Sequence, residues 1–269
     1  MHSSLKELIS LLEIEEIDAD FFRGRHPAGR RKRLFGGQVI AQALVAAKKT
    51  VDAEKMPHSL HAYFIRPGSW KMPIMFAVER IRNGRSFSTR RVLAIQNGKA
   101  IFSMDISFQL KEGGLQHQMR EAPSFEPPRE DKMVDGLKRR PFLSFRENHK
   151  LKMEQKPQSP EQYIWLKANG RVPKESFIHM ALLAYQSDEA LLSTARLPHR
   201  GNYISEQLQG ASLDHSIWFH QPVDVNDWLM YWLDSPRTGN ARGYTRGEIY
   251  NAEGVLVASC IQEGLMRMV

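Results

Sequence analysis

The order of one long helix followed by four strands is predicted twice along this chain, and this repetition constrains the fold more than any other feature. In the first half, apolar residues recur at helical spacing over residues 37–48, and four segments with alternating polar and apolar residues follow. Asn-Gly dipeptides at 83–84 and 97–98 favour tight hairpin turns between antiparallel strands. The predicted strands of this half span residues 61–66, 73–79, 90–96 and 100–109.

The second half repeats this order. Short stretches match as well, since Phe-Ile-Arg-Pro at 64–67 corresponds to Phe-His-Gln-Pro at 219–222, which is 155 positions later. Residues 97–103 correspond in the same way to 253–259, 156 positions later. Chance could match such short pieces, but the order of the elements repeats too, so we interpret the chain as a duplicated module. The second half contains a predicted helix at 176–188 and predicted strands at 212–222, 228–234, 243–250 and 255–264.

We therefore predict an α+β fold of two tandem modules, in which each antiparallel sheet of five or six strands wraps around its long helix. The N-terminal module covers residues 1–110, where a short amphipathic helix at 4–17 comes first, and the C-terminal module covers residues 161–269. Residues 111–160 hold Gly-Gly and Pro-Pro pairs and few periodic apolar positions, which is typical of a connecting segment. Two modules paired edge to edge would each cover the exposed edge strand of the other.

Composition excludes several classes of protein. Of the 269 residues, 42% are hydrophobic and 25% charged, as in globular proteins, and the net charge of +8 suits an anionic partner of some kind. Cys260 is the only cysteine, which excludes a disulfide framework or a cysteine-based zinc site; its apolar neighbours indicate an inert core thiol. No apolar run reaches ~18 residues and the first residues do not read as a secretion signal, so we expect no integral membrane association and a cytoplasmic location.

Four segments of the chain resemble one known family. They are Phe-Gly-Gly-Gln-Val-Ile-Ala-Gln-Ala at 35–43, Leu-Asp-His-Ser-Ile-Trp-Phe-His at 213–220, Ala-Arg-Gly-Tyr-Thr-Arg-Gly-Glu-Ile-Tyr at 241–250, and the final strand at 254–267. In this order they are similar to the acyl-CoA thioesterase II family, and the similarity extends over nearly the whole chain. The resemblance implies a double hotdog fold, hydrolysis of fatty acyl-CoA to free fatty acid and CoA without a cofactor or metal, and a homodimer or homotetramer. It implies acyl-CoA as the partner and no nucleic acid.

The same resemblance assigns three catalytic residues to the C-terminal module. These are Asp188 at the end of the second long helix, Ser212 before the Asp-His-Ser strand, and Gln262 in the last strand. Many family members have threonine where Ser212 stands, which keeps the hydroxyl and loses a methyl group. The resemblance implies that the three side chains hold the water that attacks the thioester.

The spacing of Asp188 and Gln262 within their predicted elements also places both side chains on inward faces. Asp188 follows Ala184, Ala181 and Phe177 by 4, 7 and 11 positions, so it continues the apolar stripe of its helix, where an unpaired carboxylate is costly to bury. Gln262 shares a strand face with small apolar residues. Each residue also has an alternative interpretation. Asp188 could be exposed to solvent at the end of its helix, Gln262 could make a purely structural hydrogen bond, and Ser212 could be an ordinary turn residue.

Other chemistries have less support. The chain contains no Gly-x-Ser-x-Gly elbow, no Gly-x-Gly-x-x-Gly and no P-loop pattern. Two alternatives stay open, a hotdog hydratase or dehydratase, which would need a His–Asp or His–Glu dyad, and a non-catalytic acyl-CoA-binding protein. The histidines at 58, 61, 215 and 220 lack a carboxylate cluster at metal spacing, so we assign them to packing or to strand ends.

Six arginines lie in the two predicted sheet regions, and some of them are candidates for binding the CoA phosphates. The alternative is that they lie on solvated strand faces. They are Arg66, Arg85, Arg90, Arg91, Arg242 and Arg246.

Overall fold

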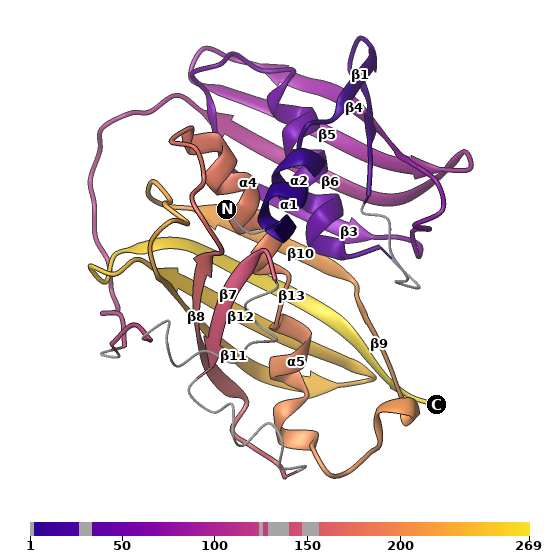
Figure 1. Ribbon diagram of the computed structural model, residues 1–269, viewed down its shortest axis with the longest axis vertical. Helices are drawn as coiled ribbons and strands as arrows, with labels where there is room; N and C mark the ends of the chain where they lie inside the picture. The colour runs from indigo at the N-terminus through magenta and orange to yellow at the C-terminus, as the bar shows by residue number, and fades with distance from the viewer. Residues whose placement is uncertain (1–2, 27–33, 124–125, 129–139, 147–155) are drawn as a thin grey trace.

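The computed structural model describes residues 3–26, 34–123, 126–128, 140–146 and 156–269, which form one antiparallel sheet around two central helices (Figure 1). The strands follow the order β1-β2-β4-β5-β6-β3-β10-β13-β12-β11-β8-β7, and β9 adds to β13. Each half therefore supplies six strands to this order, as predicted. The N-terminal half consists of α1 (Ser3–Leu11), β1 (Glu15–Asp18), β2 (Phe21–Gly24), α2 (Gly36–Lys48), β3 (Met56–Phe64), β4 (Ile74–Asn83), β5 (Phe87–Gln96) and β6 (Lys99–Gln109). The C-terminal half consists of β7 (Phe142–Arg146), β8 (Glu161–Ala168), α4 (Ser176–Ser187), α5 (Leu191–Ala195), the 3-10 turns η3 (Leu197–His199) and η4 (Ser205–Gln207), β9 (Leu208–Ser212), β10 (Asp214–Phe219), β11 (Leu229–Gly239), β12 (Arg242–Tyr250) and β13 (Leu256–Met268).

The two halves join where β3 pairs with β10, and the register at this junction reproduces the internal repeat. His61 of β3 pairs with Ser216 of β10, and these two numbers differ by 155. The next strand on each side follows the same repeat. Asp105 of β6 pairs with His61, Ile261 of β13 pairs with Ser216, and the numbers 105 and 261 differ by 156. Equivalent residues of the two modules thus meet at an approximate two-fold axis through His61 and Ser216. The predicted α+β fold of two tandem modules is confirmed.

The helices α2 and α4 lie side by side in opposite directions between the halves of the sheet (Figure 1). Residues 37–47 of α2 are all buried, which explains why that helix is rich in alanine and apolar on nearly every side. The N-terminus of α2 meets the C-terminus of α4, where Gly37 contacts Asp188. At the opposite ends, the charges of Lys48 and Glu175 interact.

Some elements differ from the sequence-based expectation. The helix expected over residues 4–17 ends at Leu11, and Glu15–Asp18 forms an edge strand paired with β2. β7 lies within the segment expected to be a connection and pairs with β8. Residues 124–125, 129–139 and 147–155 of that segment lie outside the described residues.

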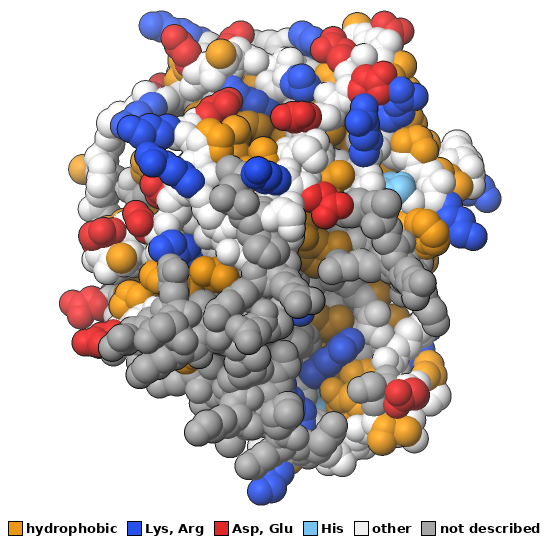
Figure 2. Space-filling view, viewed as in Figure 1, with side chains coloured by type: hydrophobic (Ala, Val, Ile, Leu, Met, Phe, Trp, Pro, Cys, Tyr) orange, Lys and Arg blue, Asp and Glu red, His pale blue; other side chains and the backbone are white. Residues whose placement is uncertain are grey.

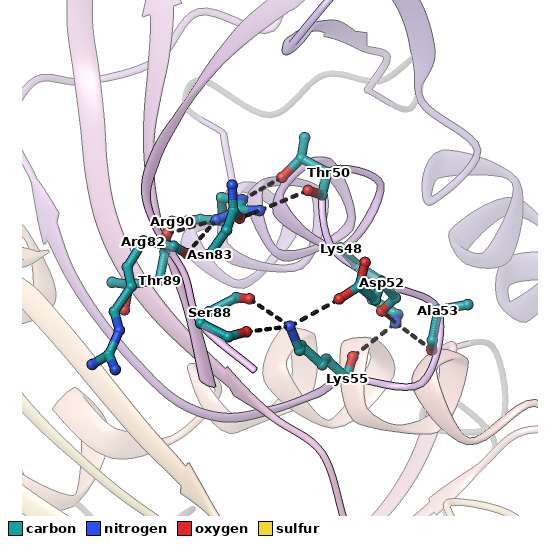
Figure 3. Close-up of polar contacts among 11 residues, drawn as sticks. Lys48, Thr50, Asp52, Ala53, Lys55, Arg82, Asn83, Ser88, Thr89 and Arg90 are labelled. Carbon is teal, nitrogen blue, oxygen red and sulfur yellow. Dashed lines mark hydrogen bonds and ion pairs between the residues drawn. The ribbon is translucent and has the colours of Figure 1, made fainter. Parts of the chain in front are cut away.

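Cationic side chains stabilise the C-terminal end of α2 (Figure 3). Arg90, at 1% exposure one of the most buried residues, donates to the Thr50 hydroxyl and carbonyl just beyond the helix, and to the side chain of Asn83. Two further bonds reach the carbonyl oxygens of residues 82 and 89. Lys48 donates to three carbonyl oxygens of the following turn. Positive charge is favourable at a helix C-terminus, so these residues fix the end of α2 against β4 and β5.

We predict that Arg90→Met destabilises the fold by about 3 kcal/mol, because it leaves buried carbonyl oxygens without donors. Thermal unfolding should record a fall of roughly 5–10 °C in the melting temperature. Arg91→Met is the matched control, since Arg91 lies on the opposite face of β5 in an exposed ion pair with Asp105, and exposed ion pairs contribute little to stability. Equal losses for the two variants would contradict this account of Arg90.

Candidate active site

The candidate site lies where the C-terminus of α4 meets the first turn of α2. Asp188 occupies the C-cap of α4, and its Oδ2 accepts a hydrogen bond of 2.9 Å from the backbone N–H of Gly37. The first N–H groups of a helix have no acceptor inside it, so Asp188 serves as a cap for α2 from another element. The positive end of the α2 dipole favours a negative charge here.

The Gly-Gly pair at the start of α2 makes this approach possible. A Cβ atom at residue 37 would collide with the carbonyl oxygen of Tyr185 in the last turn of α4. At residue 36 a Cβ would lie 2.8 Å from Oδ2 of Asp188. Any side chain at either position would push the two helix ends apart, so the glycines in the Phe-Gly-Gly-Gln segment are needed for close contact rather than for a special backbone angle.

The structure brings together all three residues predicted from the sequence. Gln262, buried in β13, donates from Nε2 to the Ser212 hydroxyl over 2.9 Å. Ser212, at the end of β9, in turn donates to Oδ1 of Asp188 over a longer distance of 3.4 Å. One oxygen of Asp188 is thus held by the backbone N–H of Gly37. The other oxygen faces the Ser212 hydroxyl, which the Gln262 side chain orients.

The sequence analysis missed His215, which it assigned to packing or to a strand end. Its side chain is fully buried, with Nδ1 3.0 Å from Oε1 of Gln262 and Nε2 2.9 Å from the hydroxyl of Ser187. The sequence signal for its inward position is the alternation along β10, because His215 lies on the same face as the apolar residues Ile217 and Phe219.

A second layer of contacts fixes the end of α4 to the sheet. The Tyr231 hydroxyl of β11 lies 2.8 Å from the carbonyl oxygen of Ser187 and 2.8 Å from the Cys260 sulfur. Burial raises the pKa of Cys260 to about 12, so the thiol stays protonated. The prediction that Cys260 lies in the core is confirmed, and Tyr231 holds the residue immediately before Asp188.

The electrostatics of the site are dominated by burial. Burial raises the pKa of Asp188 above its usual value, although the charge of His215, the Gly37 N–H and the Ser212 hydroxyl each oppose this rise. Burial also lowers the pKa of His215, against the effects of Asp188 and the bond to Gln262. Burial therefore disfavours the charged form of both groups and increases the proton affinity of the Asp188 carboxylate, a property that a general base requires.

The equivalent position in the N-terminal module has none of this chemistry. The repeat places Leu60 where β10 has His215, and Ile106 where β13 has Gln262. The C-terminal end of α2 carries Lys48 and Lys49 where α4 has Asp188. Among the residues that the structure describes, the C-terminal end of α4 is therefore the end of the helix pair where a carboxylate meets oriented donors.

The six candidate arginines have different environments. Arg90 is buried and caps α2, and Arg66 donates to a backbone carbonyl. Three others form ion pairs with carboxylates, namely Arg91 with Asp105, Arg242 with Glu263 and Arg246 with Asp234. Arg85 is exposed and has the charge of Glu112 nearby. Figure 2 shows both basic and acidic side chains on the face that it draws.

Neither a metal cluster nor a membrane helix was found within the part of the chain that the structure describes. No three histidine, cysteine, aspartate or glutamate residues there are placed to hold a metal ion together. None of the helices in that part is long and apolar enough to cross a membrane.

The chain matches known families and proteins over most of its length. Residues 23–109 match the family described as the acyl-CoA thioesterase N-terminal domain, and residues 142–265 match the acyl-CoA thioesterase family. The chain is 39% identical to acyl-coenzyme A thioesterase 8 of Homo sapiens, over 96% of this chain and 88% of that protein. It is 37% identical to acyl-CoA thioesterase 2 of Haemophilus influenzae, over 99% of both.

Solved structures give the same result. The crystal structure of an acyl-CoA thioesterase II from Mycobacterium marinum superposes with a TM-score of 0.85 at 37% identity, covering 97% of this chain and 98% of that one. A protein from Alicyclobacillus acidocaldarius described as having a hot dog fold superposes at 0.81 with only 16% identity, over the full length of both chains, and supports the fold alone. The chain belongs to the acyl-CoA thioesterase II family and has its double hotdog fold.

Proposed function

We propose that the protein hydrolyses fatty acyl-CoA to free fatty acid and CoA by direct attack of a water held by Asp188, Ser212 and Gln262. The observation that carries this proposal is the convergence of the three side chains, which arrive from α4, β9 and β13. Close relatives over nearly the whole chain are named acyl-CoA thioesterases, which supports the same substrate class.

The chemistry requires a base, a positioned water and donors for the developing oxyanion. Asp188, with its raised proton affinity, takes the proton of the water, and Ser212 and Gln262 align that water. The first turn of α2 lies beside the carboxylate and offers N–H groups to the oxyanion. Thiolate is a good leaving group, so no covalent nucleophile is needed.

The alternatives receive less support. A hydratase or dehydratase needs a histidine that acts on substrate together with a carboxylate, but both ring nitrogens of His215 are engaged inside the protein by Gln262 and Ser187. A non-catalytic binder has no need for a buried carboxylate with oriented donors, an arrangement that costs folding free energy.

We also propose that the protein forms homodimers or homotetramers. Tyr63, at 66% exposure, and Leu93, at 36%, lie in register across the outer face of β3, β6 and β5, with Ser103 between them, and Ile65 beside them is 44% exposed. An apolar row on an outer sheet face is suited to a contact with another copy. Light scattering at micromolar concentration should therefore give a mass well above that of the 30.9 kDa chain, and a monomer mass would contradict the proposal.

A cytoplasmic location is proposed as well. The only cysteine, Cys260, is a buried free thiol, which suits a reducing compartment. Fractionation of cells that express the protein would test this, and recovery outside the cytoplasm would refute it.

Asp188→Asn should lower kcat at least about 100-fold and leave KM nearly unchanged, because the amide keeps the shape but cannot accept the proton. The same variant should unfold at a higher temperature than the parent. A raised native pKa means that the fold disfavours the ionised form of Asp188. In the parent protein the contribution of Asp188 to stability therefore falls as pH rises through that pKa. Thiol release from acyl-CoA and thermal unfolding measure the two effects.

Controls for this prediction use the neighbouring residues. Ser212→Thr keeps the hydroxyl and should retain most of the rate, whereas Ser212→Ala and Gln262→Ala should each lose less than Asp188→Asn. Their combined losses should be smaller than the product of the single ones, because the three groups act on one water. A folded Asp188→Asn protein with half the parent rate would refute the assignment.

The rate should fall in acid as Asp188 becomes protonated. Because burial raises its pKa, the acid limb of the kcat/KM profile should lie above the ordinary aspartate value of 3.8. The limb should disappear from the residual activity of Asp188→Asn. Profiles of parent and variant that fall together at the same pH would assign the limb to another group.

A further inference from the structure

The orientation of the Gln262 amide is the weak point of the candidate site. The two ends of a primary amide have nearly the same shape, so packing alone does not decide which end faces Ser212. If Oε1 faced Ser212, it would accept the only hydroxyl proton of that serine, and Asp188 would lose its donor. The site therefore needs a neighbour that distinguishes oxygen from nitrogen.

His215 is such a neighbour. Its Nδ1 lies 3.0 Å from Oε1 of Gln262, and a Nδ1–H group can bond only to the oxygen end of the amide. Burial lowers the pKa of His215, so the neutral ring carries a single N–H. The Ser187 hydroxyl lies 2.9 Å from Nε2 and can donate to it, although the carbonyl of Ala184 competes for the same proton at 3.0 Å.

The bonds then run in one direction toward the carboxylate. With the proton of His215 on Nδ1, and with the Ser187 hydroxyl turned from the Ala184 carbonyl toward Nε2, Ser187 donates to His215 and His215 donates to Gln262. Gln262 then donates to Ser212, and Ser212 donates to Asp188. Because Tyr231 bonds the carbonyl oxygen of Ser187, the first member of this chain is fixed to the sheet as well.

We propose that His215 is a positioning residue, which fixes the Gln262 amide with its N–H toward Ser212 and the attacking water. This inference rests on the proposed function, since it assigns to His215 a role that acts only through Gln262. His215 touches neither the water nor the carboxylate in this arrangement, and its effect on the reaction is indirect.

Two substitutions separate positioning from packing. His215→Asn places its amide nitrogen near the position of Nδ1 and can still donate to Gln262, whereas His215→Gln places it near Nε2 and cannot. We expect kcat to fall about 10-fold to 100-fold in His215→Gln, with KM little changed, and about threefold in His215→Asn. Equal kcat values for the two variants would overturn the proposal.

The chain offers a matched control for the loss of a buried histidine. His179 is 3% exposed in α4, and its ring nitrogens lie against backbone groups of Pro173 and Val225 and the carboxylate of Asp224, away from the candidate site. His179→Gln should lower the melting temperature and leave kcat nearly unchanged. Thermal unfolding of all variants shows which are folded at the assay temperature, and a kcat loss in His179→Gln equal to that in His215→Gln would refute a specific role for His215.

A double-mutant cycle tests whether the effect passes through Gln262. In a Gln262→Ala background, His215→Gln should cause no further loss of kcat, because the amide that it orients is absent. Independent losses that multiply would overturn the positioning role and leave the proposed function intact. A Gln262→Ala protein with parental kcat would instead refute the role of Gln262 in holding the water, and the positioning role with it. A parent protein that releases no thiol from acyl-CoA would refute the proposed function itself.

Discussion

The contact between the first turn of α2 and the last turn of α4 is the interaction on which the site depends. It needs two glycines in sequence, because side chains at residues 36 and 37 would meet Asp188 and the Tyr185 carbonyl. It also brings an unpaired N–H of α2 to a carboxylate that burial disfavours. Each group satisfies the other, so an otherwise costly charge is held inside the fold at the junction of the two modules.

The two modules of the chain share one architecture but carry different side chains at equivalent positions. Both have the same sheet order and central helix, and their central strands pair through His61 and Ser216. The C-terminal end of α2 carries cations that bond carbonyl oxygens and stabilise the helix, as Arg90 does. The corresponding end of α4 carries Asp188, which the fold tolerates at a cost and which the proposed chemistry uses. Stability and reactivity are thus divided between two ends of one helix pair.

Much of the fold and part of the site could be predicted from the sequence. The boundaries of the two long helices followed from a continuous apolar pattern, whereas the first helix ends six residues earlier than predicted. The offset of 155 between the repeats matched the strand register because alternation preserves the face of each residue. Asp188 was predicted to face inward from its helical spacing, and Gln262 from strand alternation. The strands β1, β2, β7, β8 and β9 were missed because they are short or lack hairpin dipeptides beside them.

His215 could not be assigned because its partners are remote in sequence, Ser187 by 28 positions and Gln262 by 47. The roles of the arginines depended likewise on partners that only the folded chain brings near. Arg90 and Arg91 are neighbours on one strand, yet one is a buried cap and the other an exposed ion pair. Periodicity predicts the face of a residue, but it does not predict the group across from it.

If a water held at Asp188 attacks the thioester, a structure of Asp188→Asn with an intact acyl-CoA should capture that water in place. We expect an ordered water in contact with residues 188, 212 and 262, about 3–3.5 Å from the thioester carbonyl carbon. The carbonyl oxygen should face the first turn of α2. A thioester bound away from this helix junction, with no water between it and residue 188, would contradict the account.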